Sequence, residues 1–533
     1  MKPSIDSRSI VLIQPPSTLQ KLQRIKAKRP EIEAPLPFVY LAPYLLDAGF
    51  NVHVLDLRID PVSTLERNLR ELRPLIAGVS VMPGSMLRDT IEVTRRIKQT
   101  SPATKTIWGG TFPTLHYRIC LQVPYLDFVA CGDGEWTLRE LAAALADNDD
   151  ASAWKGIPGL AYEAEGEIVT TRSREPVNLD ARPVGAWQIL DRYIDHYLAP
   201  SRLLSINTAR GCPYSCTFCY NTALYRGFNR YRTKSIEASI EEIRYLHRRY
   251  LPAALIFMDD DFLANRKRGQ ALLETAHREF PHLRYRIDAR VNELKDPTIV
   301  KELATCGLES AFFGVEAASS DLLERIHKGS AVDETFDAAR VCDHFNIAGT
   351  YSFTCGYPGE TPEDLYARVK MAHMLGTIHR NSRSQLEIIS PVIGTPLYAE
   401  LDKKSLIPHY SIEHWSRFSD WKCAEGKDWI ACKRLYESFQ LAFYLAFSAP
   451  SELDGGVRRL TQLLSRWSRF RLRARAPRIL PEYRLMNRVL KCAIWGIGNR
   501  RRGTASRRRI PATRAQLARS KESRPVASMK TNR

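Results

Sequence analysis

The sequence predicts an α/β protein: a doubly wound, Rossmann-like N-terminal domain, then a partial or full β/α barrel, then a mostly helical C-terminal region. Short segments rich in valine, leucine and isoleucine alternate with amphipathic segments over residues 9–145, and the alternation resumes at residue 203. Such alternation is typical of parallel sheets covered by helices. After residue 410 the pattern becomes mostly helical. A chain of 533 residues is long enough for about three domains of ~150 residues each.

The N-terminal domain is predicted over residues 1–150. Its expected strands are 9–16, 51–57, 75–82, 105–110 and 126–135, and its expected helices are 38–50, 87–99 and 136–147. Turns that contain glycine follow three of these strands, at Gly84, Gly109-Gly110 and Gly132 to Glu135. Because doubly wound sheets bind ligands beyond the carboxyl ends of their strands, these turns predict a ligand site.

Residues 151–200 are predicted to be a connector that contains a short β-like pair, and residues 201–410 the barrel. The barrel has about six strand–helix units, with expected strands at 203–210, 254–262, 284–291, 310–318, 350–360 and 384–392. Chemistry in such barrels lies at the carboxyl ends of the strands. Residues 411–499 form the predicted helical region, and residues 500–533 are an Arg- and Ser-rich tail predicted to be disordered.

The positive charge is confined to the C-terminus. The formal net charge is +19, and residues 457–533 carry 23 Lys plus Arg against two acids, which is +21 and leaves −2 for the rest. The body of the protein is therefore close to neutral, and nucleic-acid binding is not expected. There is no apolar run of membrane-spanning length and no signal-peptide pattern at the start, so a cytoplasmic location is expected.

Three cysteines are concentrated in RGCPYSCTFCYN, at Cys212, Cys216 and Cys219. Eleven unevenly spread cysteines in a long chain argue against a disulfide framework. Structural zinc sites need four ligands, normally in two separated pairs, and the next cysteine, Cys306, is 87 residues beyond Cys219. A four-iron four-sulfur cluster with three thiolate ligands, and one iron open to a substrate or cofactor, fits the spacing better. Three buried cysteines without metal are the remaining alternative.

This spacing, with the aromatic Phe218 before the last cysteine, resembles the signature of the radical S-adenosylmethionine (SAM) superfamily. The resemblance implies that the open iron is chelated by the amino and carboxylate groups of SAM, and that electron transfer cleaves SAM to a 5′-deoxyadenosyl radical. In such chemistry the protein supplies positioning and exclusion of water. No catalytic residue beyond the cluster and cofactors is identified.

Further barrel motifs extend the resemblance. FMDDDF ends the second strand, where the family places an acceptor for the methionine amino group, and Asp259 and Asp260 are the candidates. Arg290 matches a basic residue that faces the methionine carboxylate, and an ordinary barrel salt bridge is the alternative. FFGVEAASS resembles the family's Gly-x-Glu strand, where Glu316 or Ser319 bonds the ribose. GYPGET at 356–361 is expected to form a turn near the adenine.

The N-terminal domain resembles the cobalamin-binding domain of the cobalamin-dependent radical SAM class. WGGTFPT and ACGDGEWTLREL are similar to that class's Gly-Gly-x-His-Pro-Thr and Gly-Glu-Gly-Glu stretches, with Phe112 and Asp133 as departures. Paired glycines let backbone approach the flat corrin closely. The candidate cobalamin-binding residues are Ser80, Gly109, Gly110, Gly132 and Glu135.

The usual lower axial histidine of cobalamin is missing from the turn after the first strand, which is QPPSTL at 14–19. Cobalamin without that ligand is common in this radical class. An empty, degenerate domain is the alternative. His53 and His116 are expected to be structural.

The predicted partners are a small-molecule substrate and an external reductant such as flavodoxin or ferredoxin. The helical pattern VRRLTQLLSRWSRF places Leu460, Leu463, Leu464, Trp467 and Phe470 on one face and arginines on the other. A basic amphipathic helix is typical of contact with a membrane surface or an acidic partner. The alternative is a helix that packs that face on the barrel.

The predicted function is that of a cobalamin-dependent radical SAM methyltransferase acting on an unactivated carbon or a phosphorus of a biosynthetic intermediate. One SAM molecule is expected to give the radical and a second to methylate reduced cobalamin. An oxidative cyclase or rearranging enzyme, such as the anaerobic cyclases of tetrapyrrole synthesis, is the first alternative. A nonenzymatic iron-sulfur sensor with a nucleic-acid-binding tail is the remote one.

Overall fold

The computed structural model describes residues 6–16, 32–82, 85–147, 151–225, 228, 230–404, 411–417, 433–447 and 465–472. The chain divides into two compact units, residues 1–480 and 481–533, and every described residue belongs to the first unit. Gly84 and the predicted tail from residue 500 lie outside the described residues. Within the described ranges, no helix has both the length and the apolar character needed to cross a membrane.

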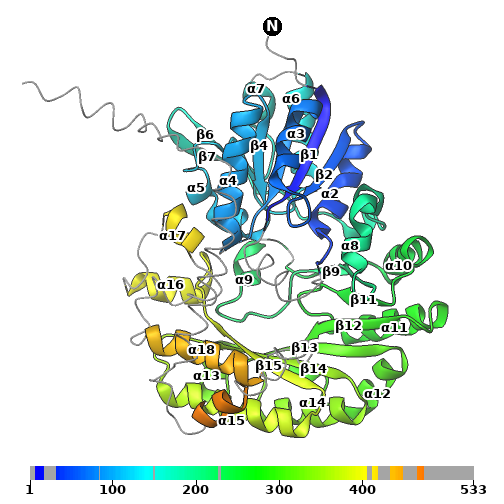
Figure 1. Ribbon diagram of the computed structural model, residues 1–533, viewed down its shortest axis with the longest axis vertical. Helices are drawn as coiled ribbons and strands as arrows, with labels where there is room; N and C mark the ends of the chain where they lie inside the picture. The colour runs from blue at the N-terminus through cyan, green and yellow to red at the C-terminus, as the bar shows by residue number, and fades with distance from the viewer. Residues whose placement is uncertain are drawn as a thin grey trace, which may run out of the picture. The chain divides into compact units, whose positions relative to one another are not determined.

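The N-terminal part is built on a seven-stranded sheet in the order β2-β1-β3-β4-β5-β6-β7 (Figure 1). The first five strands are parallel, and the last two add antiparallel neighbours at one edge. The strands are β1 (Asp6–Gln14), β2 (Asn51–Asp56), β3 (Pro74–Ser80), β4 (Lys105–Gly109), β5 (Phe128–Ala130), β6 (Leu160–Ala164) and β7 (Glu167–Thr170). The helices are α2 (Leu36–Leu46), α3 (Val62–Leu72), α4 (Ser85–Thr100), α5 (Thr111–Cys120), α6 (Gly134–Asp147) and α7 (Ala151–Trp154).

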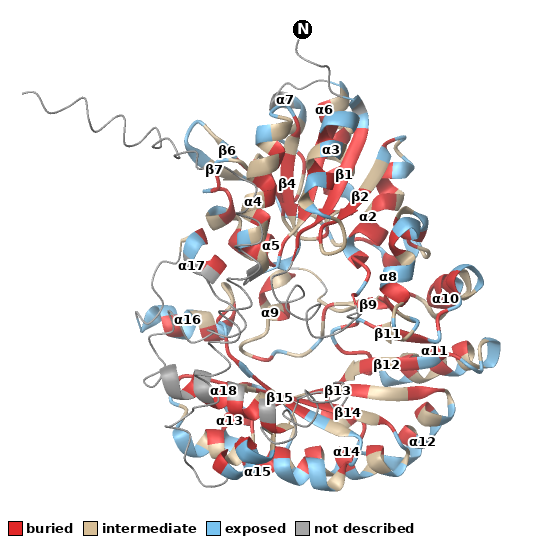
Figure 2. Ribbon diagram, viewed as in Figure 1, coloured by how far each residue is buried: buried red, intermediate tan, exposed pale blue. Residues whose placement is uncertain are grey.

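Alternate residues of the central strands enter two different cores. Ile10 and Leu12 of β1 pack in the core that contains α2 and α6, while Val11 and Ile13 pack in the core that contains α3 and α4. Residues 10–13 of β1 and 75–79 of β3 are continuous apolar runs, as expected for strands buried on both faces, and β1 is labelled in Figure 2. The predicted doubly wound fold is confirmed.

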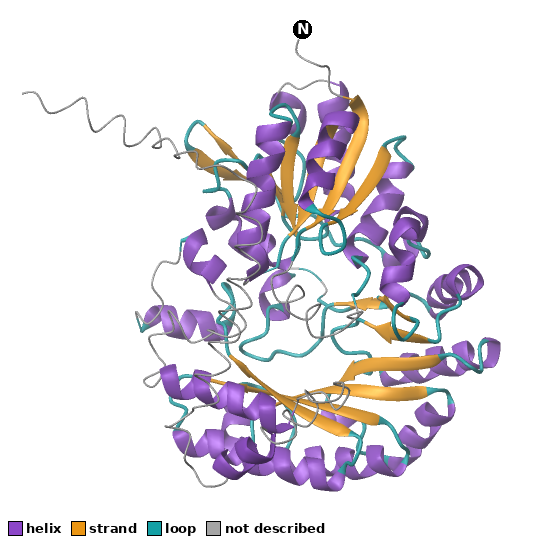
Figure 3. Cartoon of the chain, in the orientation of Figure 1, coloured by secondary structure: helices purple, strands orange, loops and turns teal. Residues whose placement is uncertain are grey.

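The second sheet has six parallel strands in the order β15-β14-β13-β12-β11-β8, so the barrel is partial (Figure 3). Its strands are β8 (Leu203–Ile206), β11 (Ala254–Phe257), β12 (Arg284–Ala289), β13 (Leu308–Glu316), β14 (Ala348–Cys355) and β15 (Ser382–Ile388). Between them lie α9 (Asn221–Leu224), α10 (Ile236–Tyr250), α11 (Arg266–Glu279), α12 (Pro297–Thr305), α13 (Ser320–Arg325), α14 (Val332–His344) and α15 (Pro362–Ile378). A two-stranded pair, β9 (Ala209–Arg210) and β10 (Arg232–Thr233), flanks the cysteine segment.

The connector contains the expected β pair, which is β6 and β7, and also 3-10 turns at Leu179–Ala181 and Trp187–Tyr193 and α8 (Ile194–Leu198). The sequence did not predict that the pair extends the N-terminal sheet through β5. The domain boundaries at 150, 200, 410 and 499 stay predictions.

After β15 the chain is helical where it is described: α16 (Pro396–Lys403) lies within the predicted barrel range, and α17 (Ile412–Arg417), α18 (Lys433–Phe447) and a helical segment at 465–472 lie in the predicted C-terminal region. In that segment Trp467 and Phe470 are 48% and 61% exposed, while Ser468 and Leu472 are buried. Arg469 fixes this orientation by donating to the carbonyl of Ala446 at 2.7 Å. The alternative prediction, in which this helix packs its apolar face on the barrel, is therefore wrong for Trp467 and Phe470. The other residues of that face, Leu460, Leu463 and Leu464, lie outside the described residues.

Candidate active site

The cysteine segment begins at a turn that accepts only glycine. Gly211 has φ 77°, and a Cβ there would lie 1.7 Å from the carbonyl oxygen of Arg230. The turn brings Cys212 out of β9, and Cys216 and Cys219 follow, all three with free thiols. Burial raises the pKa of Cys212 to about 12 and the pKa of Cys219 to about 11. Binding to metal is what would ionise these thiols at neutral pH.

The donor set matches a cluster better than a single ion. Among the described residues, no three His, Cys, Asp or Glu side chains are placed to hold one metal ion. In a four-iron cluster each thiolate binds a different iron, so its three ligands stand further apart than the ligands of one ion.

The buried polar atoms without a hydrogen-bond partner in the described structure include Oδ1 of Asp261 and Nε of Arg290 beside the cysteines, and Oδ1 of Asn221, two residues after Cys219. Nη1 of Arg290 lies 3.8 Å from the sulfur of Cys216. The guanidinium of Arg290 also stacks on the ring of Tyr214, 3.9 Å from its centre. A carboxylate oxygen and a guanidinium N–H that both lack a partner in one buried place match a ligand with an ammonium and a carboxylate group, which the methionine part of SAM has.

Asp261 shares its surroundings with Glu293, which also accepts from the backbone N–H of Arg290 at 2.9 Å. Burial and the charge of Glu293 raise the pKa of Asp261 to about 9. A cation placed at its free oxygen would restore the charged form.

The two aspartates chosen from the sequence have different surroundings. Asp259 is buried and uses both oxygens on the loop after β8, accepting from the N–H of Thr208 at 2.6 Å, from its hydroxyl at 2.6 Å and from the N–H of Ala209 at 2.8 Å. Asp260 accepts from the N–H of Gly211 at 3.0 Å and from the hydroxyl of Tyr220. Asp259 therefore braces the loop that leads to the cysteines, and the third acid, Asp261, was missed because a run of three identical side chains does not say which one is free.

Glu316 ends β13 with a positive φ of 68°, an uncommon conformation for a residue with a side chain. Its carboxylate accepts from the hydroxyl of Thr354 at 2.6 Å and from the ammonium of Lys328 at 3.2 Å. Ser319 is the N-cap residue of α13, three residues further on, and its side chain makes no capping hydrogen bond. Glu316 and Ser319 thus lie at the carboxyl end of β13.

All five predicted cobalamin-binding residues line one cavity of about 270 Å³ at the carboxyl ends of β3, β4 and β5. They are Ser80, Gly109, Gly110, Gly132 and Glu135. Gly132 has φ 85°, and a Cβ there would project into open space. The absence of a side chain at Gly132 therefore leaves the cavity open at this turn, which suits the close approach of a flat ligand.

Residues that follow the cysteines line the same cavity. Leu224 at the end of α9 and Tyr225 after it contribute to its wall, together with Asn207 and Arg210. This contribution from the barrel could not be predicted from the sequence. One short stretch, residues 210–225, therefore carries the three cysteines and borders the cavity.

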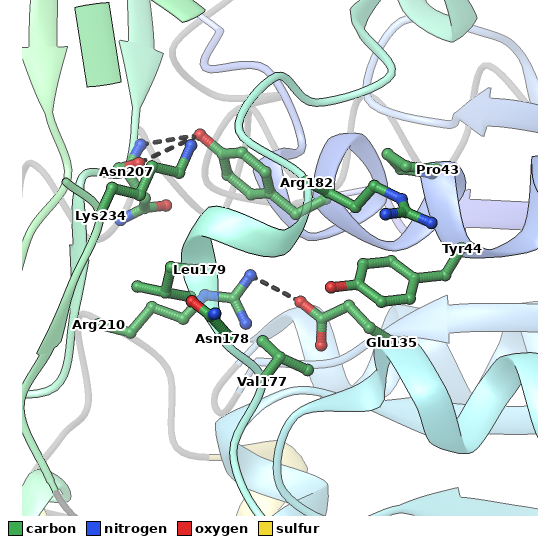
Figure 4. A pocket seen from close by; sticks show the side chains of 11 residues that line it. Pro43, Tyr44, Glu135, Val177, Asn178, Leu179, Arg182, Asn207, Arg210 and Lys234 are labelled. Carbon is green, nitrogen blue, oxygen red and sulfur yellow. Dashed lines mark hydrogen bonds and ion pairs between the residues drawn. The ribbon is translucent and has the colours of Figure 1, made fainter. Parts of the chain in front are cut away.

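Ion pairs join Arg210 and Arg232 to the turn after β5 and the start of α6, and Figure 4 shows the pair of Arg210 with Glu135. The guanidinium of Arg210 lies 2.7 Å from the carboxylate of Glu135 and 3.4 Å from that of Asp133, and Arg232 lies 2.8 Å from Asp133. Although burial acts to raise it, the charges of Arg210 and Arg232 bring the pKa of Asp133 below its ordinary value. Asp133, where the cobalamin class has a glutamate, thus serves as an anchor for two arginines.

Comparison with known proteins agrees with this geometry. The family model of the radical SAM superfamily matches residues 206–372, and the model of the B12 binding domain matches residues 23–142. An uncharacterized methyltransferase of Pyrococcus horikoshii is 30% identical over 397 residues, which are 73% of this chain and 82% of the relative. The chain belongs to the radical SAM superfamily, in the class with a B12-binding domain.

A cyclase and a methyltransferase of known structure are also similar to this radical SAM chain. The anaerobic magnesium-protoporphyrin IX monomethyl ester cyclase of Cereibacter sphaeroides is 28% identical over 384 residues, covering 70% of this chain and 61% of the cyclase. The structure of the radical SAM methyltransferase TsrM from Kitasatospora setae, solved with cobalamin and a [4Fe-4S] cluster, is 21% identical, with a TM-score of 0.61 and coverage of 75% of this chain and 78% of that one. The second likeness shows the fold.

The radical SAM and B12-binding domains make this protein an enzyme whose cofactors are a four-iron four-sulfur cluster, SAM and cobalamin, acting on a small molecule. The predicted family, fold class and cofactors are confirmed, and the nonenzymatic sensor is not supported. The individual site residues stay predictions.

His116 of this radical SAM protein lies away from the cavity lining. It is buried between the ring of Phe112, with centroids 4.5 Å apart, and that of Trp415 on α17, at 4.6 Å. Burial lowers its pKa to about 3. Phe112, the other departure from the class motif, therefore has a packing role.

Proposed function

We propose that the protein transfers a methyl group to an unactivated carbon, or to a phosphorus, of a small-molecule biosynthetic intermediate. The observation that supports this most is the shared position of residues 210–225, which hold the cysteines and border the cobalamin cavity. Both cofactors can then act on one substrate in one enclosed place. The methyltransferase of Pyrococcus horikoshii is the relative that supports methyl transfer.

The residues have separate tasks. Cys212, Cys216 and Cys219 bind three irons, Arg290 neutralises the carboxylate of SAM, and Asp261, with Asp260 beside it, accepts from its amino group. Asp259 holds the loop from which the cysteines project. When bound, these groups supply reductive cleavage of SAM and methyl transfer.

Two further groups of residues bind the rest of the cofactors. Glu316 and Ser319 receive the ribose hydroxyls of SAM at the end of β13. Cobalamin is held in the N-terminal cavity by the five residues predicted for it, which are Ser80, Gly109, Gly110, Gly132 and Glu135. The apolar walls of that cavity, such as Leu12 and Leu138, exclude water.

Product analysis tests the proposal. Methyl transfer uses two SAM molecules per product, so 5′-deoxyadenosine and S-adenosylhomocysteine should form in equal amounts with reductant and the methyl acceptor present. Deoxyadenosine without any S-adenosylhomocysteine would exclude methyl transfer and favour the oxidative cyclase reaction that the relative from Cereibacter sphaeroides carries out.

The reaction needs a one-electron reductant, and a flavodoxin or ferredoxin is the proposed donor in a cytoplasmic location.

The segment 465–472 supports a second partner, which is a membrane surface. Trp467 and Phe470 are exposed and stacked, with ring centroids 5.9 Å apart, beside the exposed Arg466. Aromatic side chains next to arginines are typical of contact with an anionic membrane surface, and the net charge of +21 over residues 457–533 adds attraction.

A further inference from the structure

The left-handed backbone of Glu316 must be held by its neighbours, because a residue with a side chain adopts a φ of 68° only at a cost. Thr354 and Lys328 hold its carboxylate, as described above. Its carbonyl oxygen accepts from Nε of Arg368 at 3.3 Å. The side chain and the main chain of Glu316 are thus fixed from two separate directions.

Arg368 lies on α15 and has no exposed surface. Its Nη1 donates to the carbonyl of Asp364 at 2.9 Å, and its Nη2 forms an ion pair with Glu360, whose side chain is equally buried. Glu360 also accepts from the backbone N–H of Gly356, the first residue of the turn after β14. The guanidinium therefore fastens the end of β13 to helix α15 and to the turn of the GYPGET motif.

A buried ion pair such as Glu360–Arg368 is by itself weak evidence for a role in stability. Apolar residues of similar volume often replace a buried ion pair without loss of stability, because two charges need not be taken out of water. Such a replacement could fill the space between α15 and β13. An apolar side chain could not donate to the carbonyl oxygen of Glu316, as Nε of Arg368 does.

We propose that Arg368, itself held by Glu360, is a positioning residue that keeps Glu316 in its left-handed conformation and so keeps the Glu316 carboxylate turned to the ribose of SAM. The inference rests on the proposed assignment of Glu316 to the ribose hydroxyls. Glu360 and Arg368 would then affect the affinity for SAM through Glu316, without direct contact with SAM.

The test replaces the pair as a unit. The Glu360→Gln/Arg368→Met double variant keeps the volume and removes both charges, and its matched control is Asp337→Asn/Arg340→Met, an exposed pair on α14. For each reconstituted protein, iron content, thermal midpoint, the Kd for SAM by calorimetry and the change in the EPR signal of the reduced cluster on SAM addition are measured. Arg368→Lys, which keeps the charge opposite Glu360 but lacks Nε, is the second variant if the first does not fold.

The expected result is unchanged iron content with a Kd for SAM raised on the order of tenfold in the double variant and in Arg368→Lys, and no change in the control. Glu316→Gln should raise the Kd similarly, and combining it with the pair variant should add little, because both act through one side chain. The SAM-induced EPR change should weaken in the same variants.

Three results would overturn the inference. If Glu316→Gln weakens SAM binding while the pair variants do not, Arg368 does not position Glu316, and the proposed function still stands. If the two losses are fully additive, they do not act through one contact. Absence of SAM binding by the unaltered protein would overturn the proposed function and the inference with it.

Discussion

Arg210 and Glu135 form an ion pair of 2.7 Å between the segment that leads to the cysteines and the turn that borders the cobalamin cavity. Arg210 stands two residues before Cys212, and Glu135 is the first acidic residue of α6. The side chain of Glu135 is almost fully buried, at 4% exposure, and that of Arg210 is 22% exposed, so the carboxylate is the more shielded partner of the pair. The relative position of the two cofactor sites is therefore set in part by this contact.

Removing this contact should loosen the cobalamin site before the cluster site. In Arg210→Met, Glu135 and Asp133 lose a cationic neighbour, and the free energy of unfolding should fall by about 2–3 kcal/mol. Cobalamin retained after gel filtration should decrease, while iron content stays close to that of the parent. Arg249→Met, which breaks the exposed pair with Asp191, is the control; full cobalamin retention in Arg210→Met would argue against the role of the pair.

Gly211 should tolerate no side chain. Gly211→Ala combines a positive φ with a Cβ 1.7 Å from a backbone oxygen, whereas Gly166→Ala, at φ 84°, meets nothing within 4 Å. The control should lose only about 1 kcal/mol in urea unfolding, from conformational strain. Gly211→Ala should lose several times more and bind little iron, and equal effects of the two changes would show that the close approach is unimportant.

The stability of the protein without cofactors should depend on pH through His116. Its pKa is about 3 in the folded protein, below the usual 6.5, so the unfolded chain binds an extra proton between these values. Stability is complete above pH 6.5 and falls as the pH decreases, by about 2 kcal/mol at pH 5. His116→Phe should flatten this dependence, the exposed His282→Phe should not, and a pH profile unchanged by His116→Phe would refute the assignment.

The exposed aromatic pair should contribute to membrane contact without contributing to stability. Trp467→Ala/Phe470→Ala should leave the thermal midpoint unchanged and reduce co-sedimentation with phosphatidylglycerol vesicles severalfold. Neutral phosphatidylcholine vesicles should bind little of either protein. Met374→Ala removes another exposed apolar side chain and is the control; equal sedimentation of the parent and the double variant would exclude this surface.

The features that are local in sequence could be predicted from it. The spacing of Cys212, Cys216 and Cys219, and the alternation of strands and helices, depend on neighbours a few residues apart. The glycine turns at Gly109-Gly110 and Gly132 also come together as expected, because parallel strands bring their carboxyl ends to one edge.

The features that depend on residues distant in the sequence could not be predicted from it. Asp259, Asp260 and Asp261 are equivalent in sequence, and only the loop some 50 residues earlier, at Thr208 to Gly211, decides which of them is used structurally. Asp133 departs from the class motif because its partners are arginines 77 and 99 residues further along. The exposure of Trp467 follows from a contact of Arg469 that helical spacing alone does not show.

One chain that holds both an iron-sulfur cluster and cobalamin should retain both after anaerobic reconstitution. Quantitation of iron, sulfide and cobalamin in the parent and in Cys216→Ala is the most direct test. We expect about four irons and about one cobalamin per chain in the parent, and loss of iron with retained cobalamin in the variant. Iron without cobalamin would contradict the assignment of the N-terminal cavity, and cobalamin without iron would contradict that of the three cysteines.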